Sequence, residues 1–157
     1  MSTPDFVLDL RSRIGHDLLW LPGVTAVVVR AEPTRVLLVK RADDGEWTPV
    51  TGIVDPGEQP AVAGTREVLE EAGVLAEPVR LASIGVSDIV TYPNGDRSQY
   101  LDLTFRFRYV GGEPHPADGE NTQAAWFAPD AFPPMSGTMR ERTFAALSDE
   151  PAAAFAR

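Results

Sequence analysis

The sequence predicts an α/β fold in which a mixed β-sheet is covered by helices on both faces. Apolar runs with the β-branched composition of strands occur before and after a central amphipathic segment. Further helical patterns lie near the start and near the end of the chain. Strands with helices before, between and after them are typical of an α/β/α sandwich. Because 157 residues suffice for one core, we expect residues 1–157 to form a single domain.

The first element is an amphipathic helix expected over residues 5–15, within an N-terminal helical extension of residues 1–20. Phe6, Leu10 and Ile14 recur at four-residue spacing, and a glycine ends the pattern. Such an apolar stripe packs either on the core of its own chain or on a second copy. A homodimer is therefore an open alternative to a monomer.

Two buried strands are expected next, at residues 24–29 and 36–39. Both are rich in β-branched residues and leucine, and the turn sequence Glu32-Pro33-Thr34 separates them. Apolar residues run continuously through both segments instead of alternating with polar ones. This pattern indicates strands that are buried on both faces of the sheet.

The second half of the chain predicts three more strands, at residues 79–90, 100–110 and 124–127. In the strand at 100–110, aromatic and leucine side chains alternate with polar or small ones, which is the period of a strand. Residues 92–96 contain proline, asparagine and glycine and are expected to form the loop before it. A helix over residues 138–147 is expected to close the fold.

The composition excludes several classes of function. A formal net charge of -9 argues against a nucleic-acid duplex or an anionic membrane as partner, because both bind basic surfaces. The chain has no cysteine, which excludes disulfides, thiolate metal sites and a cysteine nucleophile. It shows no secretion signal and no apolar run long enough to span a bilayer. A cytoplasmic location is therefore expected.

The central segment predicts a helix over residues 59–72. Asp55-Pro56-Gly57 is a turn sequence, Pro60 suits the first helical turn, and Gly73 suits the C-terminal cap. At about 100° per residue, one set of small and apolar residues gathers on a single side that we expect to face the core. This set comprises Ala61, Val62, Thr65, Val68, Leu69 and Ala72.

Three glutamates are expected on the opposite side of this helix. Glu67, Glu70 and Glu71 stand at spacings i, i+3 and i+4, which brings their carboxylates within reach of one another. Their repulsion is relieved by a hard divalent cation, so Mg²⁺ or Mn²⁺ is the expected cofactor. A solvated acidic face is the competing interpretation. Gly64 costs about 1 kcal/mol relative to alanine within a helix, and we expect it to provide clearance for a loop or ligand.

The pattern around these glutamates decides between the two interpretations. Residues 52–74 read GIVDPGEQPAVAGTREVLEEAGV and match G-x5-E-x7-R-E-U-x-E-E-x-G-U, where U is a bulky aliphatic residue. With average residue usage, this match would arise by chance on the order of once in ten million chains. The segment resembles the signature of the Nudix hydrolases.

The resemblance implies a Nudix-type α/β/α sandwich that hydrolyses the pyrophosphate of a nucleoside diphosphate linked to another group. It implies that Glu67, Glu70 and Glu71 bind the metal, assisted by Glu58 and by the backbone carbonyl of Gly52. Arg66 would orient the glutamates, or pair with Glu58. On this basis Arg66 and Glu70 are candidate catalytic residues.

Residues outside this segment are candidates for the general base and for contacts with the substrate. Glu120, in the loop before the last predicted strand, is the candidate general base, and Asp118 is the second choice. Arg41 ends an early strand and is a candidate phosphate contact. Trp47 and Tyr92 are candidates for stacking on a ring of the substrate, although an aromatic side chain near a strand end is also a common packing element.

Two enzymatic functions and one binding function are compatible with the signature segment and the candidate residues. ADP-ribose or a similar nucleoside diphosphate compound is the first expected substrate. An oxidised nucleoside triphosphate, cleaved to a monophosphate and pyrophosphate, is the alternative. A non-catalytic module that senses a nucleotide is the second alternative, although the complete set of glutamates favours an enzyme. An acidic helix that serves only to dock another protein is a third, structural interpretation.

Overall fold

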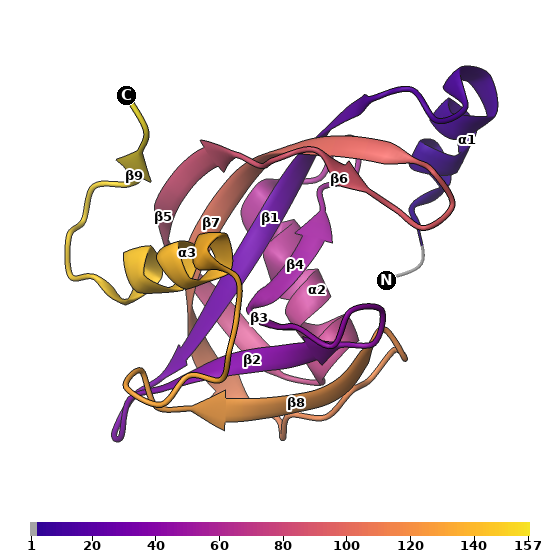
Figure 1. Cartoon of the computed structure of the whole chain (residues 1–157). Helices are drawn as coiled ribbons and strands as arrows, with labels where there is room; N and C mark the ends of the chain where they lie inside the picture. Colours follow the sequence, from indigo (N-terminus) through magenta and orange to yellow (C-terminus); the bar gives the residue numbers. More distant parts are fainter. Residues whose placement is uncertain (1–2) are drawn as a thin grey trace.

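A mixed β-sheet forms the centre of the computed structural model, which describes residues 3–157 (Figure 1). The central strand β1 (Leu19–Arg30) pairs in parallel with β7 (Arg97–Gly111). It also pairs antiparallel with β2 (Arg35–Arg41) and with β4 (Val50–Ile53). On the far side of β7, the antiparallel strand β5 (Leu75–Val86) continues the sheet.

Shorter strands extend this sheet at its margins. β3 (Trp47–Thr48) and β8 (Asn121–Phe127) both pair with β2. β6 (Val90–Thr91) pairs with β7, and β9 (Ala154–Phe155) pairs with β5. The mixed sheet expected from the sequence is thus confirmed.

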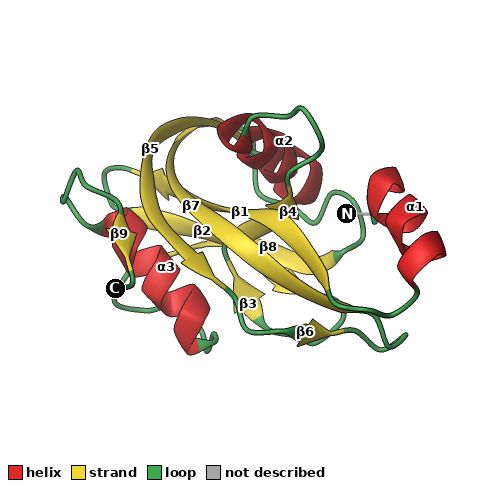
Figure 2. Ribbon diagram, turned by 90° about the horizontal axis from the view of Figure 1, so that it is seen from above, coloured by secondary structure: helices red, strands yellow, loops and turns green. Residues whose placement is uncertain are grey.

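Helices cover both faces of the sheet, as predicted (Figure 2). α2 (Pro60–Ala72) packs on one face in a cluster with Val28, Leu37 and Phe107. On the other face, Ala146 of α3 (Gly137–Leu147) packs in a second cluster. The α/β/α arrangement follows from apolar residues on both faces of the central strands.

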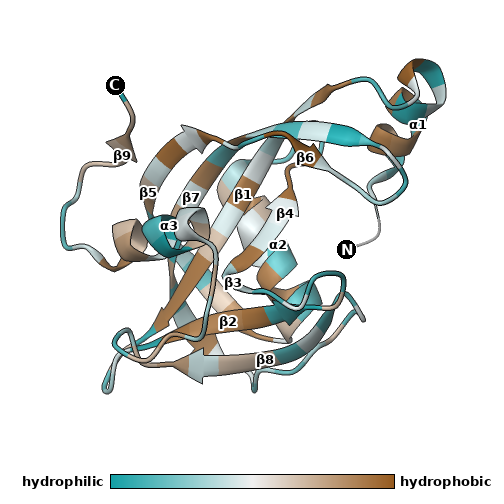
Figure 3. Cartoon of the chain, in the orientation of Figure 1, coloured by the Kyte–Doolittle hydropathy of each residue, from teal (hydrophilic) through white to brown (hydrophobic). Residues whose placement is uncertain are grey.

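The continuous apolar runs are explained by these two clusters. Val28 and Leu37 contribute to the cluster under α2, whereas their neighbours Val27 and Leu38 contribute to the cluster under α3. All four side chains are fully buried. Figure 3 shows the resulting apolar character along β1 and β2. The predicted burial on both faces is confirmed for these strands.

Most predicted boundaries agree with the structure to within a few residues. α2 begins with Pro60 at its first turn and ends at Gly73, which has a left-handed φ of 65°. The strand predicted over 79–90 ends at Val86 instead, and the short β6 follows after a break. Within residues 3–157, no helix has the length and apolar character that a membrane span requires.

The N-terminal helix α1 (Asp5–Ile14) packs on its own chain. Val7 is 5% exposed and lies in a cluster with Leu21 and Ile53, against which Phe6 also packs. Much of the helix's apolar surface is therefore used within the domain. This packing is the first of the two expected uses of the stripe, while the homodimer stays an open prediction.

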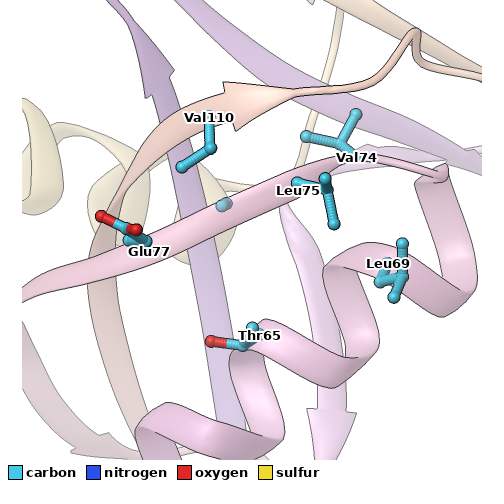
Figure 4. A pocket seen from close by; sticks show the side chains of 7 residues that line it. Thr65, Leu69, Val74, Leu75, Glu77 and Val110 are labelled. Atoms are coloured by element: carbon cyan, nitrogen blue, oxygen red, sulfur yellow. The ribbon is translucent and has the colours of Figure 1, made fainter.

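The predicted core-facing side of α2 is wrong for two of its residues. Val62 is 57% exposed and Leu69 is 48% exposed. Leu69 instead borders a groove of about 260 Å³ between α2 and β5, beside Leu75 and Val110 (Figure 4). The residues that α2 buries are Ala63, Gly64, Glu67, Val68, Glu71 and Ala72. The helix is thus rotated so that two of its glutamates point inward.

Candidate active site

A cleft of about 890 Å³ opens beside α2 and is bordered by segments from the whole length of the domain. α1 and the loop before β3 contribute to its lining, as do the loop after β6, the start of β8 and the N-terminal half of α3. Six of the predicted site residues line this cleft: Arg41, Trp47, Gly52, Glu71, Tyr92 and Glu120. The cleft lining does not include Glu58, Arg66, Glu67 or Glu70.

Glu67 is enclosed between α2 and β4. Its relative exposure is 0%, and a Cβ atom added to Gly52 would lie 2.4 Å from its Cδ atom. Because Gly52 has no Cβ atom, the carboxyl group of Glu67 can occupy this space. Burial raises the pKa of Glu67 to about 7, although Arg66 opposes the shift. The buried Oε2 atom of Glu67 has no hydrogen-bond partner in the described structure.

Arg66 joins three of the predicted glutamates. Its Nε and Nη2 atoms donate to the two carboxylate oxygens of Glu58, each at 2.9 Å. Its Nη1 atom donates to Glu67 at 2.9 Å and to Glu70 at 3.2 Å. These hydrogen bonds raise the pKa of Arg66 and lower that of Glu58. Arg66 therefore holds Glu58 in a bidentate pair and orients one oxygen of Glu67.

Glu71 forms part of the cleft wall and is only 5% exposed. Asn121, at the start of β8, donates from its Nδ2 atom to Glu71 Oε2 at 3.0 Å. Burial raises the pKa of Glu71 to about 7, against the opposing effect of the Asn121 hydrogen bond. Asn121 was not among the predicted residues. Its position directly after Glu120 is the only sequence signal that could have suggested it.

The three predicted ligands on α2 occupy different environments. Glu67 and Glu71 are buried, whereas the side chain of Glu70 is 49% exposed. No three histidine, aspartate or glutamate side chains of residues 3–157 are grouped as a metal cluster. Instead, the guanidinium of Arg66 supplies positive charge between Glu58, Glu67 and Glu70. The predicted mutual proximity of all three carboxylates is thus only partly met.

The donor set nevertheless fits a divalent cation. Two buried carboxylates with raised pKa values are costly to ionise without a positive partner. The Oε2 atom of Glu67 is a buried acceptor without a hydrogen-bond partner among the described residues, in a carboxyl group that packs against Gly52. Oxygen ligands of this kind suit Mg²⁺ or Mn²⁺. Glu67 and Glu71 are the residues best placed to hold such an ion.

Glu120 lies in the loop directly before β8. Its backbone oxygen accepts a hydrogen bond from the Ala42 amide at 2.8 Å, which ties the β8 loop to the end of β2. Its amide donates to Asp118 Oδ1 at 3.0 Å, so Asp118 shapes the loop that presents Glu120. Glu120 lines the cleft together with Glu71 and Asn121, whereas Asp118 does not line it.

The three predicted substrate contacts all line the cleft but are also engaged by their neighbours. Arg41 forms ion pairs with Asp43 and Asp44. Trp47 packs edge-on against Phe127 with a centroid distance of 4.9 Å. The hydroxyl of Tyr92 lies 2.6 Å from that of Tyr100, and burial raises the pKa of Tyr92.

A second polar network in the cleft has no counterpart among the predicted residues. Asp102 of β7 is 5% exposed and accepts hydrogen bonds from Thr25 and Thr104, both at 2.7 Å. Arg142 of α3 donates to Asp102 at 3.0 Å and to Thr25 at 3.1 Å. Asp102 and Arg142 both line the cleft. They are far apart in sequence, so no local spacing marks them as a pair.

Two curated relatives match most of the chain. A putative 8-oxo-dGTP diphosphatase of Bacillus subtilis is 37% identical over 117 residues, covering 74% of this chain and 72% of the relative. An NAD-capped RNA hydrolase of Pseudomonas aeruginosa is 34% identical over 117 residues, covering 68% of this chain and 39% of the relative. The chain thus spans less than two thirds of the length of some of the relatives that it matches.

The solved structure of a UDP-X diphosphatase has the same fold, with a TM-score of 0.66 at 20% identity. It aligns with 91% of this chain and 68% of that chain. The family model described as "NUDIX domain" matches residues 20–147, which include the signature segment, the sheet, and the helices α2 and α3. This chain belongs to the Nudix family.

Proposed function

We propose that this protein hydrolyses the pyrophosphate of a nucleoside diphosphate linked to another group, with a divalent cation as cofactor. ADP-ribose is the first substrate of this class that we propose. The proposal depends on one observation above all: the buried carboxyl group of Glu67, which packs against the cleft-lining residue Gly52, has one oxygen without a hydrogen-bond partner among the described residues. Arg66 pairs with the other oxygen of Glu67, so Oε2 still needs a donor or a cation, which the described residues do not supply to it.

The size and charge of the cleft support this substrate class. A volume of about 890 Å³ leaves room for groups on both sides of a pyrophosphate. The acidic residues of the lining outnumber its arginines. A pyrophosphate would therefore be repelled unless cations accompany it, which agrees with a metal-dependent reaction.

Each proposed role is assigned to a residue of this chain. Glu67 and Glu71 would hold the cation, with Glu70, Glu58 and the Gly52 carbonyl as further ligands. Arg66 would keep Glu58 and Glu67 in position through its hydrogen bonds. Glu120, which lines the cleft, would accept a proton from the attacking water. When bound, the cation would neutralise the pyrophosphate and lower the pKa of that water.

An oxidised nucleoside triphosphate is the second candidate substrate. The Bacillus subtilis relative named as a putative 8-oxo-dGTP diphosphatase supports it, because the chain matches 72% of that protein's length. Hydrolysis would then release a nucleoside monophosphate and pyrophosphate. Product analysis separates the two candidates, since ADP-ribose would give AMP and ribose 5-phosphate.

The test is a substrate panel with Mg²⁺, using the wild-type protein and the variant Glu71→Gln. We expect kcat to fall by about a hundredfold or more in Glu71→Gln, since the variant lacks a buried negative ligand. Glu77→Gln is the matched control, because Glu77 is an exposed glutamate that pairs with Arg108 outside the cleft. Equal loss in both variants would contradict the proposal.

The same variant separates an enzyme from a nucleotide sensor. A sensor would show no turnover and would keep most of its ligand response in Glu71→Gln. A protein-docking helix would show no Mg²⁺-dependent rise in Tm, whereas binding of a cation to the folded state raises Tm.

A further inference from the structure

Arg142 stands apart from the charged side chains that surround the proposed metal site. It projects from α3, on the face of the sheet opposite α2, and contacts the central strands through Asp102 and Thr25. Its side chain is 13% exposed and that of Asp102 is 7% exposed. The Arg142–Asp102 pair is enclosed and also lines the cleft, so it is in a position to contact a bound molecule.

The hydrogen bonds of Arg142 leave one side of the guanidinium unused. The described contacts to Asp102, Thr25 and the Met139 sulfur all come from Nη1. Nε and Nη2 have no hydrogen-bond partner among residues 3–157, and neither is a buried unpartnered atom. Because Arg142 lines the cleft, these two donors are open to a bound molecule. Together they form a fork suited to two adjacent acceptor atoms.

The charge around Arg142 favours a neutral ligand group over a phosphate. Asp102 lies 3.0 Å from the guanidinium and offsets its charge. A second anion bound there would face a carboxylate that is only 5% exposed. A neutral group with paired acceptors would gain the two hydrogen bonds without this repulsion. The fixed guanidinium also loses little conformational entropy when such a group binds.

We propose that Arg142 is a specificity residue that binds a neutral, paired-acceptor group of the substrate on the side of the cleft formed by α3. This inference rests on the proposed function, because it assigns the group that the enzyme selects besides the pyrophosphate. Two such groups differ from one nucleoside diphosphate compound to another and can therefore set specificity. One is the O6 and N7 edge of a guanine base, and the other is the vicinal hydroxyl pair of the terminal sugar.

Two matched substrate pairs distinguish these sources. GDP-glucose and ADP-glucose differ only in the base, and adenine presents a donor where guanine presents O6. ADP-ribose and the methyl ester of ADP differ in the terminal sugar. For each pair the measured quantity is the ratio of the two kcat/KM values.

The variant Arg142→Lys tests the proposal with the charge retained. Lysine can still pair with Asp102, but it cannot present two parallel donors. We expect the preference of the wild-type protein within one of the two pairs to fall about tenfold, chiefly through KM. Loss within the glucose pair identifies the base, and loss within the other pair identifies the sugar. Arg142→Gln should give the same loss, and its Tm reports any failure to fold.

Arg140→Lys is the control on the same helix. Arg140 is exposed, lies over the ring of Phe144 and does not line the cleft. Arg140→Lys should leave both kcat/KM ratios unchanged. The proposal is overturned if Arg142→Lys preserves both ratios, or if it lowers kcat/KM for all four compounds alike, which would indicate a phosphate contact or a structural role.

Failure of the proposed function is distinguishable from failure of this inference. If the protein hydrolyses none of the four compounds, the proposed function is contradicted. Calorimetric titration of the same compounds in the presence of Mg²⁺ then replaces kcat/KM with Kd. A tenfold loss of one affinity ratio in Arg142→Lys would support the role of Arg142, whereas unchanged ratios or no binding would refute it.

Discussion

Gly52 and Glu67 show how closely the position of a proposed metal ligand depends on a neighbouring residue. The carboxyl group of Glu67 occupies the space where any other residue at position 52 would place its Cβ atom. A glycine is thus required there by a close approach and not by an unusual backbone angle, because its φ is not in the left-handed region. The position of the buried Glu67 side chain therefore explains why residue 52 of the signature is a glycine.

Gly52→Ala is expected to destabilise the protein by about 1–3 kcal/mol, because the added methyl group must displace a fully buried side chain. It should also abolish the Mg²⁺-dependent rise in Tm, since Glu67 can no longer keep its position. Thermal unfolding with and without Mg²⁺ measures both effects. Gly85→Ala is the matched control, because a Cβ atom there meets nothing within 4 Å. A normal Mg²⁺ response in Gly52→Ala would refute this account.

The helix glutamates could be predicted from local spacing, and the resemblance to the Nudix signature supplied the roles of Arg66, Glu58 and Gly52. Glu67, Glu71 and Arg66 follow from a single helix, and the structure brings Arg66 into contact with Glu58 and Glu67. Asn121, Asp102 and Arg142 could not be predicted in this way. Each reaches the site through strand pairing or helix docking between distant segments, and such contacts leave no periodic pattern in the chain.

At the scale of elements, the orientation of α2 shows the limit of an amphipathic pattern. Apolar periodicity predicted that Val62 and Leu69 face the core, yet both are about half exposed. The prediction counted the glutamates as outward-facing because charged side chains are rarely buried. Here Arg66 and Asn121 provide partners that make the burial of Glu67 and Glu71 affordable. The helix therefore buries two glutamates and leaves Val62 and Leu69 about half exposed.

Gly64 was expected to clear space for a loop or ligand, and the structure shows that it clears space for the core. A Cβ atom at this position would lie 2.7 Å from Cζ of Phe107, a fully buried side chain of β7. The glycine lets α2 approach the sheet closely. This close approach sets the depth at which the glutamates of the helix enter the protein.

Gly64→Ala should destabilise the domain although alanine is the better helix former. Overpacking costs about 1–3 kcal/mol, which exceeds or matches the gain of about 1 kcal/mol in helix propensity. Chemical denaturation measures the difference. In a Phe107→Leu background the same substitution should cost less, because the clashing ring is gone. An equal cost in both backgrounds would mean that Phe107 does not limit the approach.

At the scale of the whole molecule, the cleft depends on α1 as well as on the residues around α2. Arg11 of α1 donates to the backbone oxygens of Asp17 and Arg97, both at 2.6 Å, and to Ser98 Oγ at 3.0 Å. Its side chain is 10% exposed. The helix is thereby fastened to the strand that follows the Tyr92 loop, so that one wall of the cleft is held in place.

Arg11→Gln should lower stability by about 1–3 kcal/mol, since several hydrogen bonds to a charged donor are lost. Amide hydrogen exchange near Ser98 should rise more than exchange in α2. Arg13→Gln serves as the control, because the side chain of Arg13 is 72% exposed and its ion pair is with Asp9 of the same helix. If both variants behave alike, α1 does not support the cleft wall through Arg11.

The parallel pairing of β1 with β7 has a consequence for synthesis of the chain. Leu19 lies opposite Ser98 and Val29 opposite Arg108, so the central pair joins segments separated by most of the domain. On the ribosome, β1 must wait for β7 before its valines find their final neighbours. During that interval the apolar strand that contains Val27 and Val28 is unpaired and can associate with other nascent chains. Chaperone demand during translation is therefore expected to end only after β7 has emerged.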